Sequence, residues 1–518
     1  MCSVDLSLVP GWRVIFNPLT ELVFLPTAGA MLLVLFPRRF DRAFHFIGVL
    51  IMALTLGLSL RLAGEFVLGT AELQFIQIVP WIASYGIAYF VGMDGISLIL
   101  ILLTTFLSLL ALFSSLNSVT ERRKEFVISM LLLETAMIGT FAAQDLFLFY
   151  VFWEAMLIPM YILIGVFGGP RRIYATLKFF LFTMGGSVLM LVGILLLYVM
   201  HERQFGFYST ALPDLLRISM RSGLQVWLFG AFALAFAIKI PLFPFHTWLP
   251  DAHVEAPTAG SVVLAGILLK MGGYGLLRLA LPLFPFGAET FAPVLGGVAV
   301  IGIIYGAYVA MGQEDIKKLI AYSSVSHMGF VVLGIASLTP VGLNGAMFQM
   351  VAHGISTGTL FLLVGMMYER RHTRMIADYG GLGHVAPRFA AVFFLMTLTA
   401  IGLPGLCGFV GEFLILAGSF RALALDHPAW FVGLAVVGII LGAVYMLSLY
   451  ERIFWGTVRF KENETFRDLR WQEVATLAMP IVLAVWLGIQ PNLILSRISP
   501  SVQSIVSRVR VQSVAELP

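Results

Sequence analysis

Apolar runs of about 20 residues recur along nearly the whole 518-residue chain, separated by mostly short polar connections. A membrane-spanning helix needs about 20 consecutive apolar residues, whereas the strands of a membrane barrel alternate apolar and polar positions over about ten. The alternating pattern is missing, so we predict an all-α polytopic membrane protein. About fourteen membrane helices are expected over residues 22–36, 43–62, 95–116, 126–143, 146–168, 175–200, 224–245, 257–280, 292–312, 320–337, 343–367, 389–420, 429–450 and 474–492.

Lysine and arginine in the connections predict the orientation of these helices. With the N-terminus outside, the inward connections, beginning with Arg38, Arg39 and Arg42, carry about 19 of these residues and the outward segments about 10. Because cytoplasmic loops are the more basic, both termini are expected to face the periplasm. The first 20 residues lack a basic segment followed by an apolar core, so no cleavable signal peptide is expected.

Composition removes several classes of function. Charged residues make up 12% of the chain, against about 25% in globular domains, and the mean hydropathy is +0.95. The two cysteines, Cys2 and Cys407, support neither a disulfide framework nor an iron–sulfur cluster. Dinucleotide, P-loop and haem-attachment motifs are missing, and the net charge of +4 forms no nucleic-acid patch. The energy for any transport must therefore come from an ion gradient or from a partner.

Two of the predicted helices, the seventh and the twelfth, are interrupted by proline. Pro241 follows Lys239 in AFAIKIPLFPF, and Pro404 lies in TLTAIGLPGLCGFVGEFLIL. Proline frees backbone carbonyls, which a membrane tolerates only where protein or water satisfies them. Interrupted helices at corresponding positions of two halves are typical of a transport path at the membrane midplane.

This correspondence predicts two inverted five-helix repeats. The expected division of the chain is N-terminal helices in 1–124, a first repeat in 125–285, a second repeat in 286–455, and a loop, last helix and tail in 456–518.

An acid and a base are predicted to face each other in the first repeat. Glu154 lies deep in LFLFYVFWEAMLIPMYILIGVFGG, one turn before Pro159, and Lys239 is its natural partner. Ionisable groups inside a membrane are costly and mark ion or proton paths by default. A buried lysine loses proton affinity on desolvation and regains it beside a carboxylate, so a moving carboxylate can switch Lys239. The structural alternative is a static buried ion pair.

Four further ionisable groups, on helices eight, ten, eleven and twelve, continue the series: Lys270, His327, His353 and Glu412. Histidine titrates near physiological pH, although each histidine taken singly also fits a hydrogen-bonded packing role. Together the groups predict an acid–base relay. Small hydroxyl residues are expected to hold water between them: Ser323, Ser324, Ser326, Ser356, Thr357 and Thr359.

Other polar residues give weaker signals. Glu134 and Lys178 lie in or near the membrane and are secondary candidates for the path. The connection after Pro241 holds ligand types for a metal, but their spacing fits no zinc signature, so a capped helix connection is expected there instead. These residues are His246, Asp251, His253 and Glu255.

The segments that carry these residues resemble a known family. YVFWEAMLIPMYILIGVFGG, KIPLFPFHTWLPDAHVEAPTAGSVVLAGILLKMGGYGLLR, KKLIAYSSVSHMG, MVAHGISTGTLFLLVG and GLPGLCGFVGEF are similar to the antiporter-like membrane subunits of proton-pumping NADH:quinone oxidoreductase, respiratory complex I. The resemblance covers about residues 85 to 455. It implies fourteen core helices with helices seven and twelve interrupted.

The resemblance also implies roles for the buried residues. The family's helix-five glutamate falls on Glu154, and its lysines of helices seven and eight fall on Lys239 and Lys270. Its central-axis histidines correspond to His327 and His353.

Glu412 indicates the type of subunit. Glutamate at this position of helix twelve is typical of M-type subunits, called chain 4 in mitochondria, whereas lysine is typical of the L and N types and of related antiporter subunits. The resemblance is therefore to the M type.

The first hypothesis is a proton-translocating subunit of complex I, coupled to NADH-to-quinone electron transfer in other subunits. The resemblance implies an enzyme subunit that itself holds no redox centre, cofactor or metal; flavin, iron–sulfur clusters and quinone are expected in partner subunits. Its expected surroundings are the lipid bilayer of a bacterial inner membrane, or an equivalent energy-transducing membrane, with L- and N-type subunits as neighbours.

Two alternatives stay open on the residues alone. One is a subunit of a multisubunit sodium/proton antiporter, driven by ion gradients, against which Glu412 argues. The other is a structural spacer whose buried charges only specify how the helices pack.

Overall fold

The computed structural model describes residues 17–37 and 41–515. Cys2, Arg38 and Arg39 lie outside the described residues, as does the side chain of Arg42. Within the described part, thirteen helices are long and apolar enough to cross a membrane, and two shorter apolar helices follow one another where the twelfth crossing is predicted. The prediction of a polytopic helical membrane protein with about fourteen spans is confirmed.

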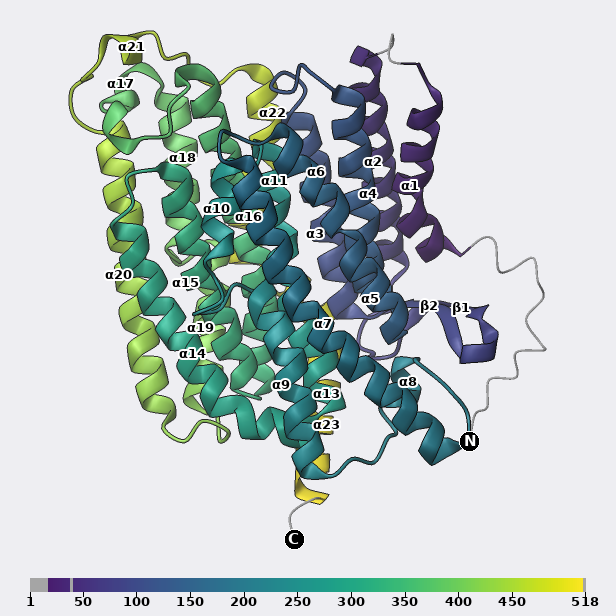
Figure 1. Cartoon of the computed structure of the whole chain (residues 1–518). Helices are drawn as coiled ribbons and strands as arrows, with labels where there is room; N and C mark the ends of the chain where they lie inside the picture. The colour runs from purple at the N-terminus through teal and green to yellow at the C-terminus, as the bar shows by residue number, and fades with distance from the viewer. Residues whose placement is uncertain (1–16, 38–40, 516–518) are drawn as a thin grey trace.

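The apolar helices stand side by side in one bundle (Figure 1). Their bounds are α1 Pro18–Leu35, α2 Asp41–Glu65, α3 Gly95–Ser114, α4 Arg123–Ala142, α5 Leu146–Ala155, α6 Leu157–Phe167, α7 Arg172–Phe205, α9 Ser222–Lys239, α11 Thr258–Val263, α12 Leu269–Gly275, α13 Leu281–Leu283, α14 Pro285–Met311, α15 Ile316–Ala336, α16 Pro340–Arg371, α18 Pro387–Ala400, α19 Cys407–Phe420, α20 Pro428–Phe454 and α22 Trp471–Ile489.

Three crossings are interrupted rather than continuous. The seventh ends as α9 at Lys239 and resumes as α10 (Trp248–Glu255), with Pro241 in the gap. The twelfth ends as α18 and resumes as α19, with Pro404 in the gap. The fifth is divided at Met156, between α5 and α6, an interruption that the sequence analysis does not predict. Because proline lacks an N–H, Pro159 in the first turn of α6 cannot donate back to the carbonyl of Ala155 at the end of α5.

The eighth crossing is continuous but irregular. Its α-helical segments α11, α12 and α13 are joined by two π-helical turns, η4 (Leu264–Leu268) and η5 (Leu276–Ala280). Single π-turns inside α-helices occur frequently at functional sites. Lys270 follows the first of these turns directly, at the start of α12.

The centre of the bundle includes the crossings that carry Lys270, His327 and His353 of the predicted relay. The most apolar stretches of α16, α15 and the eighth crossing are 100%, 94% and 94% buried, whereas those of α20 and α22 are 33% and 28% buried. Side chains on the central helices therefore face protein on all sides. Any charge there must be satisfied by other protein groups or by enclosed water.

Small residues allow the central helices to pack closely. A Cβ added to Gly306 of α14 would lie 2.8 Å from the backbone nitrogen of Ser326 on α15, and one added to Gly329 of α15 would lie 2.8 Å from the carbonyl oxygen of Ala299. Lipid supplies no hydrophobic force between helices, so such close packing is a main source of their association.

Further elements lie at the lower half of the bundle in Figure 1. Strands β1 (Gln74–Ile82) and β2 (Ile87–Met93) form an antiparallel hairpin, α8 (Leu212–Leu215) follows α7, and α23 (Asn492–Ala515) packs against α3, α14 and α16. The all-α prediction omitted the hairpin, and the predicted C-terminal tail contains a 24-residue helix.

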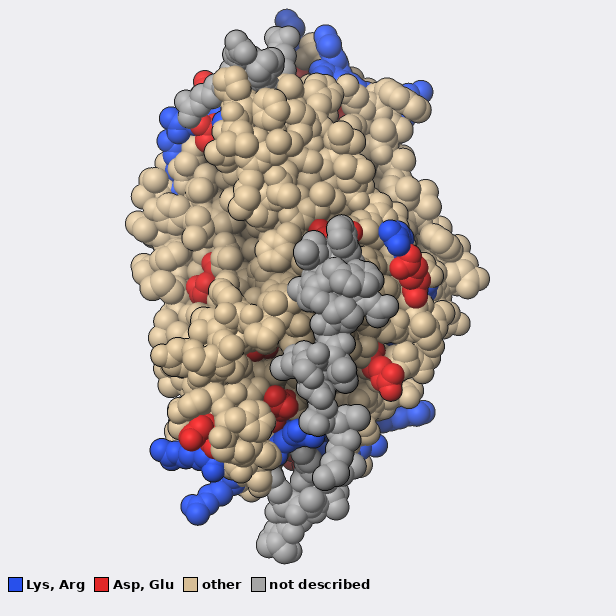
Figure 2. Space-filling view, turned by 90° about the vertical axis from the view of Figure 1, so that its right-hand side faces the viewer, with Lys and Arg blue, Asp and Glu red and all other residues tan. Residues whose placement is uncertain are grey.

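The lateral surface is that of a membrane protein. Figure 2 shows most lysine and arginine side chains on that face at its upper and lower ends, with mostly uncharged residues and some acidic ones between them. Large apolar side chains along the long helices are exposed, including Leu189 and Val192 of α7 and Ile440 of α20. A bilayer covers such surfaces without cost.

Replacing Gly306 by alanine should destabilise the bundle by about 1–3 kcal/mol, because the new methyl group would meet the backbone of α15. The matched control is Gly297→Ala on the same helix, where an added Cβ meets nothing within 4 Å. Thermal inactivation in mild detergent measures the effect. Equal half-inactivation temperatures for the two variants would contradict this account of the packing.

Candidate functional site

The buried ionisable groups form two clusters inside the bundle. The first contains Glu154 on α5 and Lys239 at the end of α9. The second extends from the eighth crossing through α16 and α15 to α19, and its members are Lys270, His353, His327 and Glu412.

Lys239 lies in an apolar, aromatic environment. Its side chain is 1% exposed, with the ammonium 4.9 Å from the centre of the Trp153 ring and 3.4 Å from the Sδ atom of Met156. The helix stops at this residue because Pro241 cannot continue it. The indole N–H of Trp248 donates to the freed carbonyl of Ile238 at 2.9 Å, which satisfies part of the broken end.

Glu154 is close to Lys239 without forming an ion pair with it. The two groups interact electrostatically. Among the described residues, however, the Lys239 nitrogen and the Glu154 oxygens do not approach within the 4.0 Å of an ion pair. The Oε1 atom of Glu154 is buried and accepts no hydrogen bond from a described residue. A static buried pair would need close contact and satisfied oxygens to be stable. The cluster is therefore an acid and a base held apart.

Lys270 contacts His353 directly. Its Nζ atom lies 2.6 Å from Nδ1 of His353 and also donates to the carbonyl oxygen of Ala265 in the π-helical turn η4. An ammonium has no lone pair, so Nδ1 must be the acceptor when Lys270 is charged, and the ring proton is then on Nε2. Among the described residues, that Nε2 atom has no hydrogen-bond partner. It is available to a water molecule or to a moving neighbour.

His327 and Glu412 continue the second cluster. The rings of His353 and His327 are 5.7 Å apart between centres, and Nδ1 of His327 lies 3.4 Å from Oε1 of Glu412. This contact has ion-pair distance but not hydrogen-bond alignment. The same oxygen accepts from Nε2 of Gln349 at 3.3 Å.

The interrupted twelfth crossing supports the position of Glu412. Gly402 and Gly405, on either side of Pro404, have backbone φ angles of +73° and +94°, which residues other than glycine rarely adopt. A Cβ on Gly402 would lie 2.6 Å from Oε2 of Glu412. The glutamate therefore packs directly against the broken helix end.

The structure thus joins four of the six predicted residues by short contacts and leaves the other two as a separate cluster. Among the described residues, no hydrogen bond or ion pair connects Lys239 to Lys270. The predicted water-holding hydroxyls largely bond to backbone instead: Ser323, Ser324, Ser326, Ser356 and Thr359 each donate to a carbonyl oxygen. Such bonds within or between helices are the usual fate of serine and threonine in apolar surroundings.

The end of α10 is held by cations that the sequence analysis did not select. Lys317 of α15 donates to the carbonyl oxygen of Ala256 at 2.8 Å, and Arg374 donates to that of Val254. Cations stabilise the carboxyl end of a helix because its last carbonyls are unpaired and carry partial negative charge. Sequence reasoning counted these two cations only as basic residues of the connections, and that count gave no sign that they cap a helix.

The residues of the Pro241 connection have structural partners. The carboxylate of Asp251 pairs with Lys178 at 2.7 Å, and that of Glu255 accepts from the backbone N–H of Arg171 at 2.9 Å. His253 is fully buried and stacks on Phe361 at 4.5 Å. These residues form a capped connection, as expected from their spacing.

Glu134, the other secondary candidate, stands apart from both clusters. It is fully buried on α4, and neither carboxylate oxygen has a hydrogen-bond partner among the described residues. A carboxylate without partners is costly to bury in its charged form.

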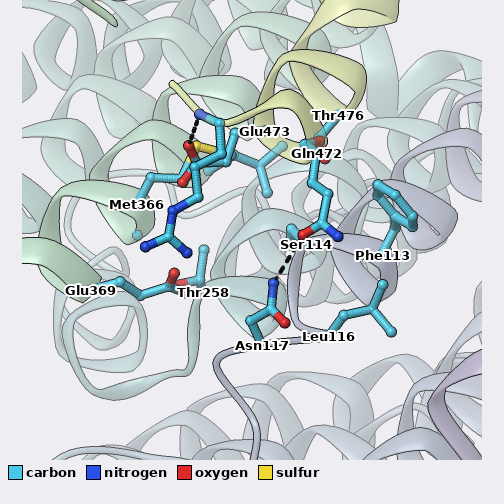
Figure 3. Close-up of a pocket in the computed structure, with 13 residues that line it drawn as sticks. Phe113, Ser114, Leu116, Asn117, Thr258, Met366, Glu369, Gln472, Glu473 and Thr476 are labelled. Atoms are coloured by element: carbon cyan, nitrogen blue, oxygen red, sulfur yellow. Dashed lines mark hydrogen bonds between the residues drawn. The ribbon is translucent and has the colours of Figure 1, made fainter. Parts of the chain in front are cut away.

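A small cavity lies at the upper end of the bundle, away from the clusters. Its volume is about 40 Å³, and polar side chains of α3, α16 and α22 line it. Figure 3 shows Asn117 and Gln472 pointing toward one another, joined by a hydrogen bond of 3.2 Å. Glu473 in the wall forms a two-pronged pair with Arg370 at 2.6 and 2.8 Å. The cavity has room for a few water molecules and lies where α22 meets α3 and α16.

Comparison with known proteins identifies the family. Residues 31–140 match the family model described as NADH-ubiquinone oxidoreductase chain 4, amino terminus, and residues 143–442 match NADH:quinone oxidoreductase/Mrp antiporter, TM. NADH-quinone oxidoreductase subunit M of Rhodobacter capsulatus is 45% identical over 501 residues, which cover 95% of this chain and 96% of that protein. The chain belongs to the subunit M family.

Solved structures agree with this assignment. A chain of respiratory complex I from Thermus thermophilus superposes with a TM-score of 0.84 at 34% identity, covering 95% of this chain and 99% of that one. A chain of the Mrp complex from Dietzia sp. DQ12-45-1b superposes with a TM-score of 0.82 at 19% identity, covering 96% of this chain, a likeness of fold alone. The chain is therefore a membrane subunit of proton-pumping complex I, as the resemblance predicted.

Replacing Lys317 by methionine should lower the stability of this subunit by about 1–3 kcal/mol, because the carbonyl of Ala256 would lose its donor in a buried site. Lys318→Met is the matched control, since Lys318 is adjacent but partly exposed and a surface change of this kind costs at most about 0.5 kcal/mol. Thermal denaturation of the purified complex distinguishes them. Identical shifts for both variants would show that the cap on α10 is unimportant.

Proposed function

We propose that this subunit conducts protons through the two buried clusters while its partners carry out NADH oxidation and quinone reduction. The observation that carries the proposal is the 2.6 Å contact between Lys270 and His353, because it joins a base of the first half to the histidines of the second. Buried bases in direct contact exchange a proton with little atomic movement. The ionisable groups of the path are Glu154, Lys239, Lys270, His353, His327 and Glu412.

In this scheme Glu154 and Lys239 act as a switch. Approach of the carboxylate raises the proton affinity of the amine, and its withdrawal lowers it. Moving one proton against about 180 mV costs about 4 kcal/mol. Two unit charges brought to about 4 Å interact by about 4 kcal/mol at an effective dielectric constant of about 20. A small displacement of α5 at its Met156 interruption is therefore energetically adequate.

The second cluster passes the proton sideways and then outward. A charged Lys270 gives its proton to Nδ1 of His353, and the proton on Nε2 of that ring leaves toward His327. From His327 the proton is delivered to Glu412, whose carboxylate lies against the interrupted twelfth crossing. The Nε2 atom of His353 needs a water molecule or a small ring movement to complete the step, because the two ring centres are 5.7 Å apart.

The wider setting belongs to the same proposal. The basic connections support cytoplasmic loops and periplasmic termini in a bacterial inner membrane. Residues 125–285 and 286–455 act as the two antiporter-like repeats, flanked by 1–124 and 456–518. L- and N-type subunits are the proposed neighbours, and flavin, iron–sulfur clusters and quinone belong to partner subunits.

The sodium/proton antiporter alternative has one observation in its favour, the likeness in fold to the Mrp complex chain. At 19% identity that likeness does not extend to function, whereas the 45% identical relative is a subunit M. Proton uptake driven by a sodium gradient, without a redox substrate, would support the antiporter. A structural spacer would instead keep full pumping after neutralisation of its buried charges.

Replacing Lys239 by alanine should leave the complex assembled but reduce NADH-driven proton pumping and quinone reduction to a small fraction of the unmodified rate. The expectation follows because the switch loses its proton-carrying group. Pumping is measured as acidification inside inverted membrane vesicles. NADH oxidation by an artificial acceptor reports separately whether the redox partners are present.

Lys318→Ala is the control for this experiment, since that lysine is near the membrane surface and outside both clusters. It should pump normally. Normal pumping by assembled Lys239→Ala vesicles would refute the switch and favour the spacer.

A further inference from the structure

The eighth crossing carries a second row of polar groups that the proposed path does not use. Tyr274 and Arg278 follow Lys270 at intervals of four residues, so all three lie on one side of this crossing. The row runs from the centre of the bundle toward its lower end, where Asp94 and Gln144 lie. It is therefore a polar connection from Lys270 toward the proposed periplasmic face.

Tyr274 lies between Lys270 and Arg278 in this row. Its fully buried hydroxyl donates to the carbonyl oxygen of Phe141 at 3.0 Å and lies 3.3 Å from the hydroxyl of Ser97. A phenolic hydroxyl both donates and accepts hydrogen bonds, so it can relay a proton when no positive charge stands beyond it. The barrier of this row must therefore lie beyond Tyr274.

Arg278 forms the next step and is a fixed cation. Its Nη1 atom lies 3.3 Å from Oδ2 of Asp94, whose side chain is fully buried, and its Nη2 atom donates to Oε1 of Gln144 at 3.1 Å. The guanidinium is only 16% exposed. Arginine has five donors, accepts no hydrogen bond and stays charged in proteins.

Three elements hold this ion pair in place. Asp94 caps α3 by accepting from the N–H of Ser97 at 3.0 Å. Gln144 is fixed by β2, since its backbone N–H donates to the carbonyl of Phe90 at 2.9 Å and its amide to that of Gly92 at 3.3 Å. The hairpin thereby closes over the lower end of the eighth crossing.

Helix α23 covers the same end from another direction. The guanidinium of Arg508 donates to the carbonyl oxygen of Pro282 at 3.0 Å and to that of Leu216. These bonds tie the last turn of the eighth crossing to the segment after α8. The lower end of the eighth crossing is thus held by two separate sets of bonds, one made by Arg278 and one by Arg508.

We propose that Arg278, held by Asp94 and Gln144, is an electrostatic seal that keeps protons on the periplasmic side from returning to Lys270. The inference rests on the proposed role of Lys270 in proton transfer. A fixed positive charge in a narrow, low-dielectric passage repels protons, and arginine serves this purpose in other membrane pores. Without the seal, the proton gradient made by the complex would discharge through its own relay.

The seal explains why a buried ion pair is retained at this position. Replacing a buried pair by apolar residues is often neutral or stabilising, so stability alone is a weak reason to keep one. The Nε–H of Arg278 has no partner among the described residues. Arg278 thus offers the row an unused hydrogen-bond donor and no acceptor that could take up a proton.

The test uses the intact complex in proteoliposomes, in which a pH gradient is imposed by a rapid change of the external pH, because variants that lack Lys270 would not build one with NADH. The rate at which the pH gradient decays reports the passive return of protons. Arg278→Met should speed the decay several-fold while quinone reduction in uncoupled vesicles stays normal. Arg278→Lys, which keeps the positive charge, should hold the gradient as long as the unmodified protein.

Two further variants separate the seal from general damage. Lys270→Met/Arg278→Met should restore slow decay, because the leak then lacks its inner proton acceptor. Asp94→Asn/Arg278→Met leaves no unpaired buried charge and should leak like Arg278→Met even if the single variant fails to assemble. Failure of the proposed relay itself is read independently, from NADH-driven pumping by Lys239→Ala.

The proposal is overturned if the neutral variants hold the gradient as well as the unmodified complex. It is also overturned if Arg278→Lys leaks as fast as Arg278→Met, or if the leak persists when Lys270 is replaced as well.

Discussion

The contact between Lys270 and His353 is the interaction on which this structure depends. It lies in the most buried part of the bundle, on helices with almost no lipid exposure, and it connects the two proposed repeats. A bilayer offers no water to a stranded charge, so both groups must be supplied with partners by the protein. Ala265 supplies one through the π-helical turn beside Lys270. The irregular backbone of the eighth crossing is thus part of the chemistry.

The interrupted helices follow the same constraint. Each break exposes carbonyl groups that must be satisfied. Trp248, at the start of α10, donates to the end of α9, and Lys317 of α15 with Arg374 donates to the end of α10. Glu412 occupies the break in the twelfth crossing. Buried charges and broken helices therefore occur together because each provides groups that the other needs. In the proposed path, the interruption at Met156 between α5 and α6 is the place where movement is expected.

Hydropathy was sufficient to predict the helices, and the cost of burying charge was sufficient to select the ionisable residues. The same reasoning could not place them relative to one another, because contacts such as His327 with Glu412 join helices far apart in sequence. It also missed the β1–β2 hairpin, whose apolar stretches are too short to cross a membrane as helices. It missed α23 as well, because apolar and polar residues are mixed in that helix. Arg278 was overlooked because its partner, Asp94, lies 184 positions away. In the sequence alone, a single arginine near the end of a helix cannot be told from an ordinary basic loop residue.

The most direct test of the central claim is the proton-to-electron ratio of the intact complex in proteoliposomes when Lys270 is replaced by methionine. The side chain keeps a similar length, so packing should be preserved while the contact with His353 loses its proton. The account predicts an assembled complex whose NADH-driven proton translocation is strongly reduced, together with the quinone reduction coupled to it. An unchanged ratio at an unchanged rate of quinone reduction would contradict it, since protons would then cross without the group that joins the two halves.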